Sequence, residues 1–300
     1  MKRFLKWAGA SVLGLVVILV AFVGYQIYSF NSYMESPVEA PAVDLVAVAD
    51  SAVLARGAHI ANSYGGCAGC HGPDLSGGMV EDMGPLGVMI PSNLTTGQGG
   101  VGSEYSDAEL ARAIRYGVRK DGHSLLFMPS EEHVWWSDAD LQAVVSYVRS
   151  LPPVDAQREP SQVGTLGKLI TKFGMMELRS AAQAAHLDMG TAPDPEPTAR
   201  YGAFLALSCK GCHGQGLAGG PIPGAPPDMA VPTNLTPHDT GLGTWTYDDF
   251  VHAMNTGLRP DGSQIDPFMP TEGYARMSDL EKTAMWEYLR SLPATEFGRR

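Results

Sequence analysis

Two short cysteine motifs constrain this chain more than any other feature of its sequence. The pentads Cys67–His71 (CAGCH) and Cys209–His213 (CKGCH) contain all four cysteines among its 300 residues. This spacing is typical of c-type haem attachment, in which two thiols form thioethers with the haem vinyl groups and the histidine binds the iron. We therefore predict two covalently bound haem c groups. Their predicted attachment residues are Cys67, Cys70, His71, Cys209, Cys212 and His213.

Other uses of four cysteines fit the pattern less well. Cysteine pairs that share a zinc ion usually lie about 15–20 residues apart, whereas Cys70 and Cys209 are separated by 139. A thioredoxin-like redox motif does not require the histidine that follows both pairs. Disulfides are plausible in an exported protein, but they also leave the two histidines unexplained.

The pentads belong to a tandem repeat. Three further motifs recur at an offset of 141 residues: Pro-x-Asn-Leu-Thr, Phe-Met-Pro and Tyr-x-Arg-Ser-Leu-Pro. They occupy residues 91–95, 127–129 and 147–152 in the first copy, and residues 232–236, 268–270 and 288–293 in the second. The pentads recur at an offset of 142 and Arg-x-Asp-Gly (119–122 and 259–262) at 140, so the offset drifts by only two residues over most of a domain. Such a long period indicates two copies of one fold and not a solenoid.

Each copy predicts a few helices joined by irregular, glycine-rich loops. A middle helix begins near Ser106 or Thr246, and a last helix begins at Ser137 or Ser278, because these side chains cap helix N-termini. Glu281 follows Ser278 by three residues, which completes a capping box. In the segment between the copies, the apolar residues of 166–173 can form one helix face, which we expect to pack on the two haem domains; a partner-binding helix is the alternative.

Two methionines are the best candidates for the second axial position of each iron. Met128 and Met269 follow the pentad histidines by 57 and 56 residues, and each stands within Phe-Met-Pro. A thioether is a soft, neutral ligand, and His/Met ligation raises the reduction potential. His123 and His133 are alternatives in the first copy, but the second copy has no counterpart of either. We therefore predict His71, Met128, His213 and Met269 as the iron ligands.

Several polar and aromatic residues also recur between the copies. The loop asparagines and threonines can hydrogen-bond haem propionates or a loop carbonyl, and the arginines can pair with propionates. Ordinary turn, surface and core roles stay equally open for all of them. These residues are Asn93, Thr95, Arg119, Asn234, Thr236, Trp245 and Arg259.

The N-terminus has the pattern of a membrane anchor. No charged residue occurs from Trp7 to Met34, and Lys2, Arg3 and Lys6 precede this stretch. It is long enough to span a bilayer with its basic end inside. A cleavable signal peptide is the alternative, but its apolar region would be shorter and would end in small residues. We favour an uncleaved anchor.

The charge balance limits the partners. The formal net charge is −11, so we predict no nucleic-acid binding. An acidic exterior suits docking to a basic patch on a redox partner protein. The 35 glycines and 22 prolines indicate loop-rich domains.

With these motifs, each repeat resembles a class I cytochrome c domain, and the series is similar to that of membrane-bound bacterial multihaem cytochromes c, including cytochrome subunits of alcohol and gluconate dehydrogenases. The resemblance implies an all-α, loop-rich fold of tandem class I domains behind an N-terminal transmembrane helix. It also implies that the last helix of each copy crosses the first at Gly57 or Gly202. Many such subunits carry three haems, whereas this chain has two pentads. The expected segments are an anchor (1–34), domain 1 (50–153), a linker (154–195) and domain 2 (196–293).

The expected function is electron transfer by a periplasmic dihaem cytochrome anchored in the inner membrane. The donor would be a dehydrogenase or a quinol-oxidising complex, and the acceptor a terminal oxidase, a soluble cytochrome or a cupredoxin. Two alternatives stay open. The chain can be a subunit of a larger dehydrogenase or respiratory complex, or a dihaem enzyme of the peroxidase or thiosulfate-oxidising type. An enzyme needs a displaceable axial ligand, and the matching methionines weigh against it.

Overall fold

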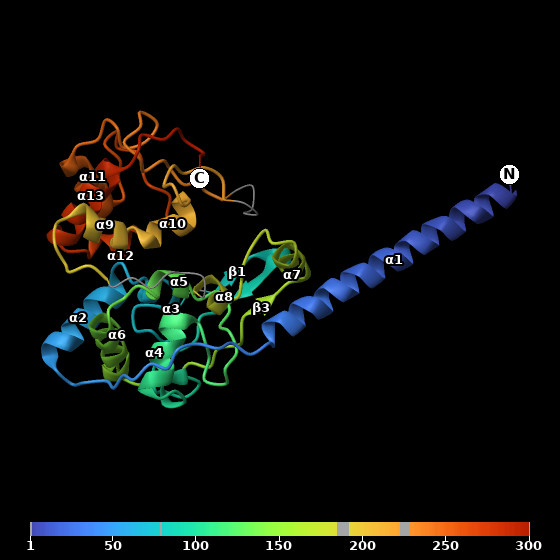
Figure 1. Cartoon of the computed structure of the whole chain (residues 1–300), viewed down its shortest axis with the longest axis horizontal. Coiled ribbons are helices and arrows are strands. Elements are labelled where there is room, and N and C mark those ends of the chain that lie inside the picture. The colour runs from blue at the N-terminus through green and yellow to red at the C-terminus, as the bar shows by residue number, and fades with distance from the viewer. Residues whose placement is uncertain (1, 79, 185–191, 223–228, 300) are drawn as a thin grey trace.

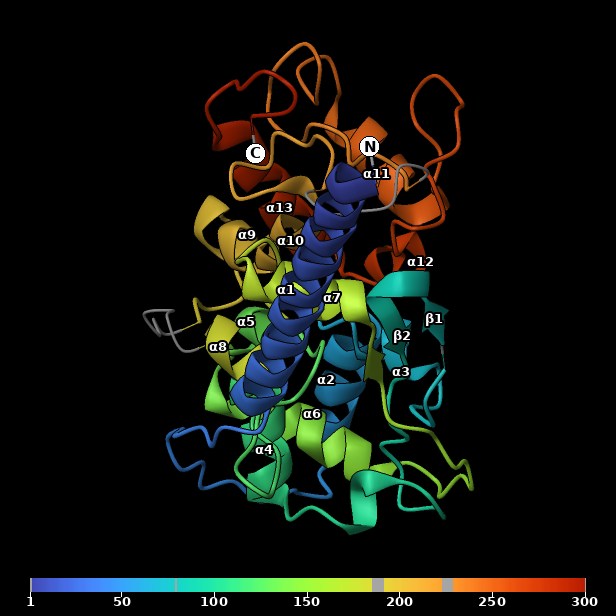
Figure 2. The ribbon, with the colours of Figure 1, turned by 90° about the vertical axis from the view of Figure 1, so that its right-hand side faces the viewer.

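The computed structural model describes residues 2–78, 80–184, 192–222 and 229–299. Within these residues the chain forms thirteen α-helices, two short 3₁₀ helices and one small sheet. A long N-terminal helix, α1 (Lys2–Met34), projects from a body of two lobes, one above the other in Figure 1. Figure 2 looks from the right-hand side of Figure 1, toward the N-terminal end of this helix, and shows both lobes behind it.

Helix α1 has the properties of a membrane anchor. Residues Arg3–Met34 have a mean hydropathy of 2.3 in their most apolar window, and no part of that window is buried against the protein. It is the one helix in the described part of the chain that is long and apolar enough to cross a membrane. Exposing this much apolar surface to water is unfavourable, so its length and composition fit an anchor.

The two lobes repeat one series of helices. The first lobe contains α2 (Ser51–Asn62), α3 (Cys67–His71), α4 (Asp107–Tyr116), α5 (Ser130–His133) and α6 (Asp138–Ser150). The second contains α9 (Ala199–Leu205), α10 (Leu207–His213), α11 (Tyr247–Thr256), α12 (Thr271–Ala275) and α13 (Asp279–Ser291). In each lobe the first helix packs against the last, α2 on α6 and α9 on α13.

A glycine lies at the crossing of each pair of helices. A Cβ atom added to Gly57 would stand 1.9 Å from the carbonyl oxygen of Ala143, and one added to Gly202 would stand 1.9 Å from that of Ala284. Only glycine permits backbones to approach so closely. The predicted crossing at these two glycines is confirmed, and its geometry is the same in both lobes.

The predicted helix starts are confirmed as well. Ser106 and Thr246 cap α4 and α11, and Ser137 and Ser278 cap α6 and α13, each by accepting a backbone N–H at the third position of its helix. Glu281 completes the capping box of α13, as its spacing from Ser278 predicts.

One small sheet departs from the all-α expectation. Strands β1 (Glu81–Asp82), β2 (Gly87–Met89) and β3 (Gln162–Val163) pair antiparallel in the order β1-β2-β3. Strands of two or three residues are too short to produce an alternating pattern in the sequence. The sheet ties the segment after α6 back to the loop that follows the first pentad.

The segment between the lobes also packs in a way that the sequence did not predict. Helix α7 (Thr165–Lys172) contacts β2 and the 3₁₀ helix η1 (Gly84–Leu86) of the first lobe, but its largest contact is with α1. The remaining elements are a second 3₁₀ helix, η2 (Val101–Ser103), and α8 (Ser180–Ala184), which packs on α4 and α5.

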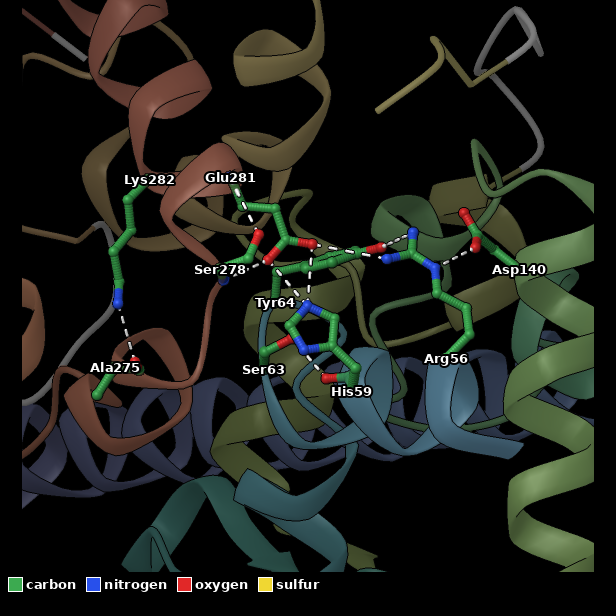
Figure 3. Close-up of polar contacts among 9 residues, drawn as sticks. All are labelled: Arg56, His59, Ser63, Tyr64, Asp140, Ala275, Ser278, Glu281 and Lys282. Atoms are coloured by element: carbon green, nitrogen blue, oxygen red, sulfur yellow. Dashed lines mark hydrogen bonds and ion pairs between the residues drawn. The ribbon is translucent and has the colours of Figure 1, made fainter. Parts of the chain in front are cut away.

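A buried carboxylate joins the two lobes. His59 Nε2 of α2 lies 3.0 and 2.9 Å from the two carboxylate oxygens of Glu281 in the second lobe. Arg56 Nη1 lies 3.6 Å from the same group, while its Nε donates to Asp140 at 2.8 Å and its Nη2 to the hydroxyl of Tyr64 at 2.9 Å. Figure 3 shows this cluster between the lobes. The Glu281 side chain is only 3% exposed, so its charge depends on these partners.

Candidate haem-binding sites

Each pentad forms a short helix that ends at its histidine. Helices α3 and α10 both end at a glycine with positive φ, 81° at Gly72 and 82° at Gly214. In each case the glycine N–H donates to the carbonyl of the residue four positions before it, Ala68 or Lys210. The chain therefore leaves both histidines in the same local geometry.

A backbone carbonyl fixes the tautomer of each pentad histidine. His71 Nδ1 lies 2.8 Å from the carbonyl oxygen of Ser92, and His213 Nδ1 lies 2.7 Å from that of Thr233. A carbonyl oxygen can only accept, so Nδ1 carries the hydrogen and the lone pair of the neutral ring is on Nε2. Ligating histidines commonly have this arrangement. Burial lowers the pKa of His71, and the Ser92 hydrogen bond opposes this effect only in part. The lowered pKa also favours the neutral ring.

The carbonyl acceptors are held by buried side chains next to them. Asn93 and Asn234 follow the two acceptor residues directly, and each donates to a carbonyl beyond the last helix of its lobe, Val154 at 2.8 Å or Thr295 at 2.7 Å. Each asparagine also accepts from the N–H and hydroxyl of the threonine two residues later. Of the roles left open for these residues, the structure shows hydrogen bonds to loop carbonyls and bonds within the turn.

The second lobe contains a cavity of about 270 Å³ at its pentad. Cys212, His213 and Met269 all line it, so the structure brings the predicted iron ligands to one space. Trp245 and Phe250 contribute to its walls, which are mainly apolar. A flat apolar macrocycle with one histidine and one thioether ligand fits these residues.

Met128 lies in the first lobe in the same turn as Met269 in the second. The carbonyl of Met128 accepts from Ser130 N at 2.8 Å, and that of Met269 accepts from Thr271 N at 2.7 Å. The proline after each methionine has nearly the same backbone angles, with ψ at 60° in both. Both turns lead directly into a short helix, α5 or α12. The correspondence between Met128 and Met269 therefore extends from the sequence to the backbone that follows each methionine, whereas Phe127, before Met128, has a positive φ of 66° that Phe268 does not share.

The two alternative histidines of the first lobe have other surroundings. His133 is buried, its ring lies 4.4 Å from that of Trp136, and its Nε2 is 3.2 Å from the Gly65 carbonyl. Burial lowers its pKa to about 4, so it is neutral. His123 lies beside Asp121 in an exposed turn, with Nδ1 3.2 Å from Oδ1.

The recurring arginines have unequal positions. Arg259 lines the cavity of the second lobe and donates to the Gln264 carbonyl at 2.7 Å. Arg119 instead pairs with Asp121, with Nη2 2.9 Å from Oδ2. Pairing of these arginines with propionates stays a prediction.

The thiols do not have the environment of a redox pair. Burial raises the pKa of Cys67 and of Cys209 to about 12, whereas a reactive cysteine needs a lowered pKa. The cysteines form no disulfide. In the described residues no group of three or more His, Cys, Asp or Glu side chains gathers as a metal site. The raised pKa of the first thiol in each pentad thus disfavours a thioredoxin-like redox role.

The class of the protein follows from comparison with family models. Residues 52–148 match the family described as cytochrome c oxidase, cbb3-type, subunit III, and residues 201–293 match the family cytochrome c. The chain therefore contains two cytochrome c domains, which implies covalently bound haem c and a role in electron transport.

Individual relatives extend this similarity over both domains. The chain is 28% identical over 277 residues to the cytochrome c subunit of alcohol dehydrogenase (quinone) from Gluconobacter oxydans, and 31% identical over 274 residues to that from Komagataeibacter europaeus. These alignments cover 84% and 82% of this chain. The gluconate 2-dehydrogenase cytochrome c subunit of Pantoea cypripedii is 37% identical over 96 residues, 30% of this chain and 22% of that protein.

The chain is thus homologous to cytochrome c subunits of quinone alcohol, fructose and gluconate dehydrogenases. Its alignments with the two quinone alcohol dehydrogenase subunits span 57% of their length.

Proposed function

We propose that this chain is a membrane-anchored, two-haem c-type cytochrome that relays electrons from a respiratory donor to a terminal oxidase or a soluble carrier. The observation that carries the proposal is the duplicated site: in each lobe a pentad histidine is oriented by a carbonyl, and a methionine follows in an equivalent turn. Two equivalent sites on one chain suit stepwise electron transfer better than catalysis at one open iron.

In this proposal the residues of each lobe hold one haem. The four cysteines would form the thioethers, and His71 with Met128 and His213 with Met269 would hold the two irons. Bound haem supplies a one-electron ferrous/ferric couple. The protein orients the histidines through their Nδ1–H groups, would supply Met128 and Met269 as thioether ligands, and lines the site of the second lobe with apolar side chains such as Trp245, which would keep water away. Ligands on both sides of the iron weigh against a peroxidase or thiosulfate-oxidising enzyme.

The proposed placement follows from α1. Residues 1–34 would anchor the chain in the inner membrane with the basic end inside, as the positive-inside rule predicts. The domains of residues 50–153 and 196–293, with the linker 154–195, would then lie in the periplasm. Relatives that are subunits of alcohol, fructose and gluconate dehydrogenases favour a dehydrogenase as electron donor. They equally support a permanent place in such a complex.

Haem counting tests the proposal. The purified holoprotein should contain two covalently bound haems, measured as the pyridine adduct per polypeptide. The variants C67A/C70A and C209A/C212A should each retain one, and the remaining haem should keep the spectrum of His/Met ligation. A haem that acid acetone extracts, or loss of both haems from either variant, would contradict the proposal.

Copurification from gently solubilised membranes tests the partner. A dehydrogenase recovered in fixed ratio with the chain would establish the complex, and recovery of this polypeptide alone would favour a separate carrier.

A further inference from the structure

Helix α7 lies beside the C-terminal part of α1 in both views of the molecule (Figure 1, Figure 2). The ring of Phe173, at the end of α7, stacks on that of Phe22 with the centroids 6.4 Å apart. Residues 3–22 of α1 are exposed on every side, whereas one face is partly covered from Val23 onward. The contact between the helices thus begins inside the apolar stretch of α1.

The Phe173 contact falls within the length of α1 that a bilayer covers. A hydrocarbon core of about 30 Å takes about 20 helical residues at about 1.5 Å each. Counted from the charged Lys6, which precedes the uncharged stretch, these residues end near Gln26. Phe22 is then roughly 6 Å inside the hydrocarbon boundary. The ring stacked on it lies at a similar depth.

The lysines of α7 reach in the opposite direction. Lys168 Nζ lies 3.1 Å from Asn31 Oδ1 and 5.7 Å from the centroid of the Phe30 ring. Lys172 Nζ lies 5.5 Å from the centroid of another α1 ring, that of Tyr33. Their α1 partners Phe30, Asn31 and Tyr33 come after Gln26 in the chain and so lie on the polar side of the estimated boundary. Ammonium groups at headgroup level, with aromatic and aliphatic side chains toward the acyl chains, characterise interfacial helices.

The first lobe holds α7 firmly in this orientation. Gly164 N donates to the Leu86 carbonyl at 2.8 Å, and a Cβ added to Gly167 would stand 2.3 Å from the same oxygen. With these faces occupied by η1 and α1, Phe173 and Met175 point outward, 55% and 57% exposed. Exposed apolar side chains next to a membrane span are a continuation of its apolar surface.

We propose that the end of α7 is a second membrane contact, in which Phe173 and Met175 enter the acyl layer beside α1. Its ligand is phospholipid, with Lys168 and Lys172 at the level of the headgroup phosphates. The proposal rests on α1 being the membrane anchor. Two contacts, unlike one, fix the orientation of the first lobe relative to the membrane and hence the side that faces a partner.

Nitroxide depth measurements on the full-length holoprotein test this contact. The variants F173C and M175C, reduced and reconstituted in phosphatidylcholine vesicles, are spin-labelled, and collisions with oxygen, which concentrates in acyl chains, are compared with those of a water-soluble nickel chelate. We expect the ratio of the oxygen collision rate to the nickel-chelate collision rate to be several-fold higher at F173C and M175C than at F297C. Phe297 is a half-exposed phenylalanine of the second lobe and serves as the control. V16C in α1 reports whether the anchor is inserted.

The outcomes separate this inference from the proposed function. If V16C lies in lipid while residues 173 and 175 behave as F297C does, α7 stays in water and the second contact is refuted; this includes the case of a protein partner covering α7. If V16C is also in water, the anchor itself fails. The unsubstituted holoprotein should take up no label, because its cysteines form thioethers. Labelling of that chain would contradict haem attachment and not the depth result.

Discussion

At the scale of single residues, each candidate iron site depends on groups that would not bind iron themselves but position the side chains that would. The pentad histidine is oriented by a backbone carbonyl, and that carbonyl is held by the buried asparagine that follows it. The methionine is positioned by a turn whose proline and next N–H are the same in both lobes. Ligand geometry is therefore set by backbone as much as by the ligands themselves.

Met269→His tests the thioether ligand of the second lobe. Imidazole is the stronger donor to ferric iron, so one of the two reduction waves should move down by on the order of 0.2 V while the other stays in place. Potentiometric titration of the holoprotein measures both waves. Met254→Leu is the matched control, because Met254 lines the same cavity. A shift with M254L and none with M269H would show that Met269 is not the ligand.

Asn234→Ala tests the support of the carbonyl that orients His213. The change removes a donor to Thr295 and an acceptor for Thr236, and it leaves buried polar groups without partners. We expect a loss of about 2–3 kcal/mol in unfolding free energy of the second lobe, measured by urea denaturation followed by circular dichroism. Thr240→Ala removes an exposed hydroxyl that the same amide and His238 Nδ1 contact and should cost about 0.5–1 kcal/mol. If both variants lose the same unfolding free energy, the bonds of Asn234 to Thr295 and Thr236 are not what stabilises this loop.

The sequence indicates which side chains would hold haem, and this stays a prediction, but it does not indicate the backbone groups around them. The cysteines, histidines and methionines recur at nearly constant offset, which any self-comparison detects. The acceptor carbonyls of Ser92 and Thr233 leave no such trace, because every residue carries a carbonyl. Glu281 was predicted only as a cap, since its second role depends on His59, 222 residues earlier.

At the scale of elements, the crossing of first and last helices organises each lobe. It brings the helix before the pentad and the helix after the methionine turn into one core. In the first lobe Ile60, Leu141 and Val144 are fully buried in this core. Repetition made this crossing predictable. The three short strands were not, because they are too short to produce an alternating pattern, and the packing of α7 on α1 was not, because α7 lies between the two copies.

Gly202→Ala tests the crossing of α9 and α13. Its methyl group would overlap the Ala284 carbonyl, at 1.9 Å, so the helices must separate. Overpacking of this kind should cost about 3 kcal/mol or more, seen as a lower thermal midpoint and a lower yield of holoprotein. Gly211→Ala in the pentad helix of the same lobe is the control, because its Cβ would meet only Glu132 Oε1, at 3.8 Å. If both variants melt alike, the close approach is not what stabilises the lobe.

At the scale of the whole molecule, the relative position of the two lobes decides how electrons could pass between them. The lobes meet at a charged cluster of Arg56 and His59 around Glu281, whose carboxylate is buried. Removing one member of such a buried group leaves the others uncompensated. The cluster therefore specifies one docking geometry more than it adds net stability.

Lowering the pH should release the lobes from each other, through Glu281. Burial acts to raise the pKa of this carboxyl, but the hydrogen bonds from His59 and Ser278 outweigh burial and hold it below its usual value. A group with a lowered folded pKa stabilises at pH above its unfolded pKa, and this contribution is lost as the pH falls through the folded value. Docking should thus be intact at neutral pH and weaken in acid, seen as a larger radius of gyration in X-ray scattering.

Glu281→Gln separates this effect from the cap of α13. Glutamine at this position still completes a capping box, so α13 should keep its helicity while docking loses its charge pair. The cost in docking free energy should be about 1–3 kcal/mol at neutral pH, and the acid expansion should disappear. Asp121→Asn removes an exposed ion pair away from the interface and should retain the acid expansion of the unsubstituted chain. Persistence of the expansion in E281Q would mean that another group controls docking.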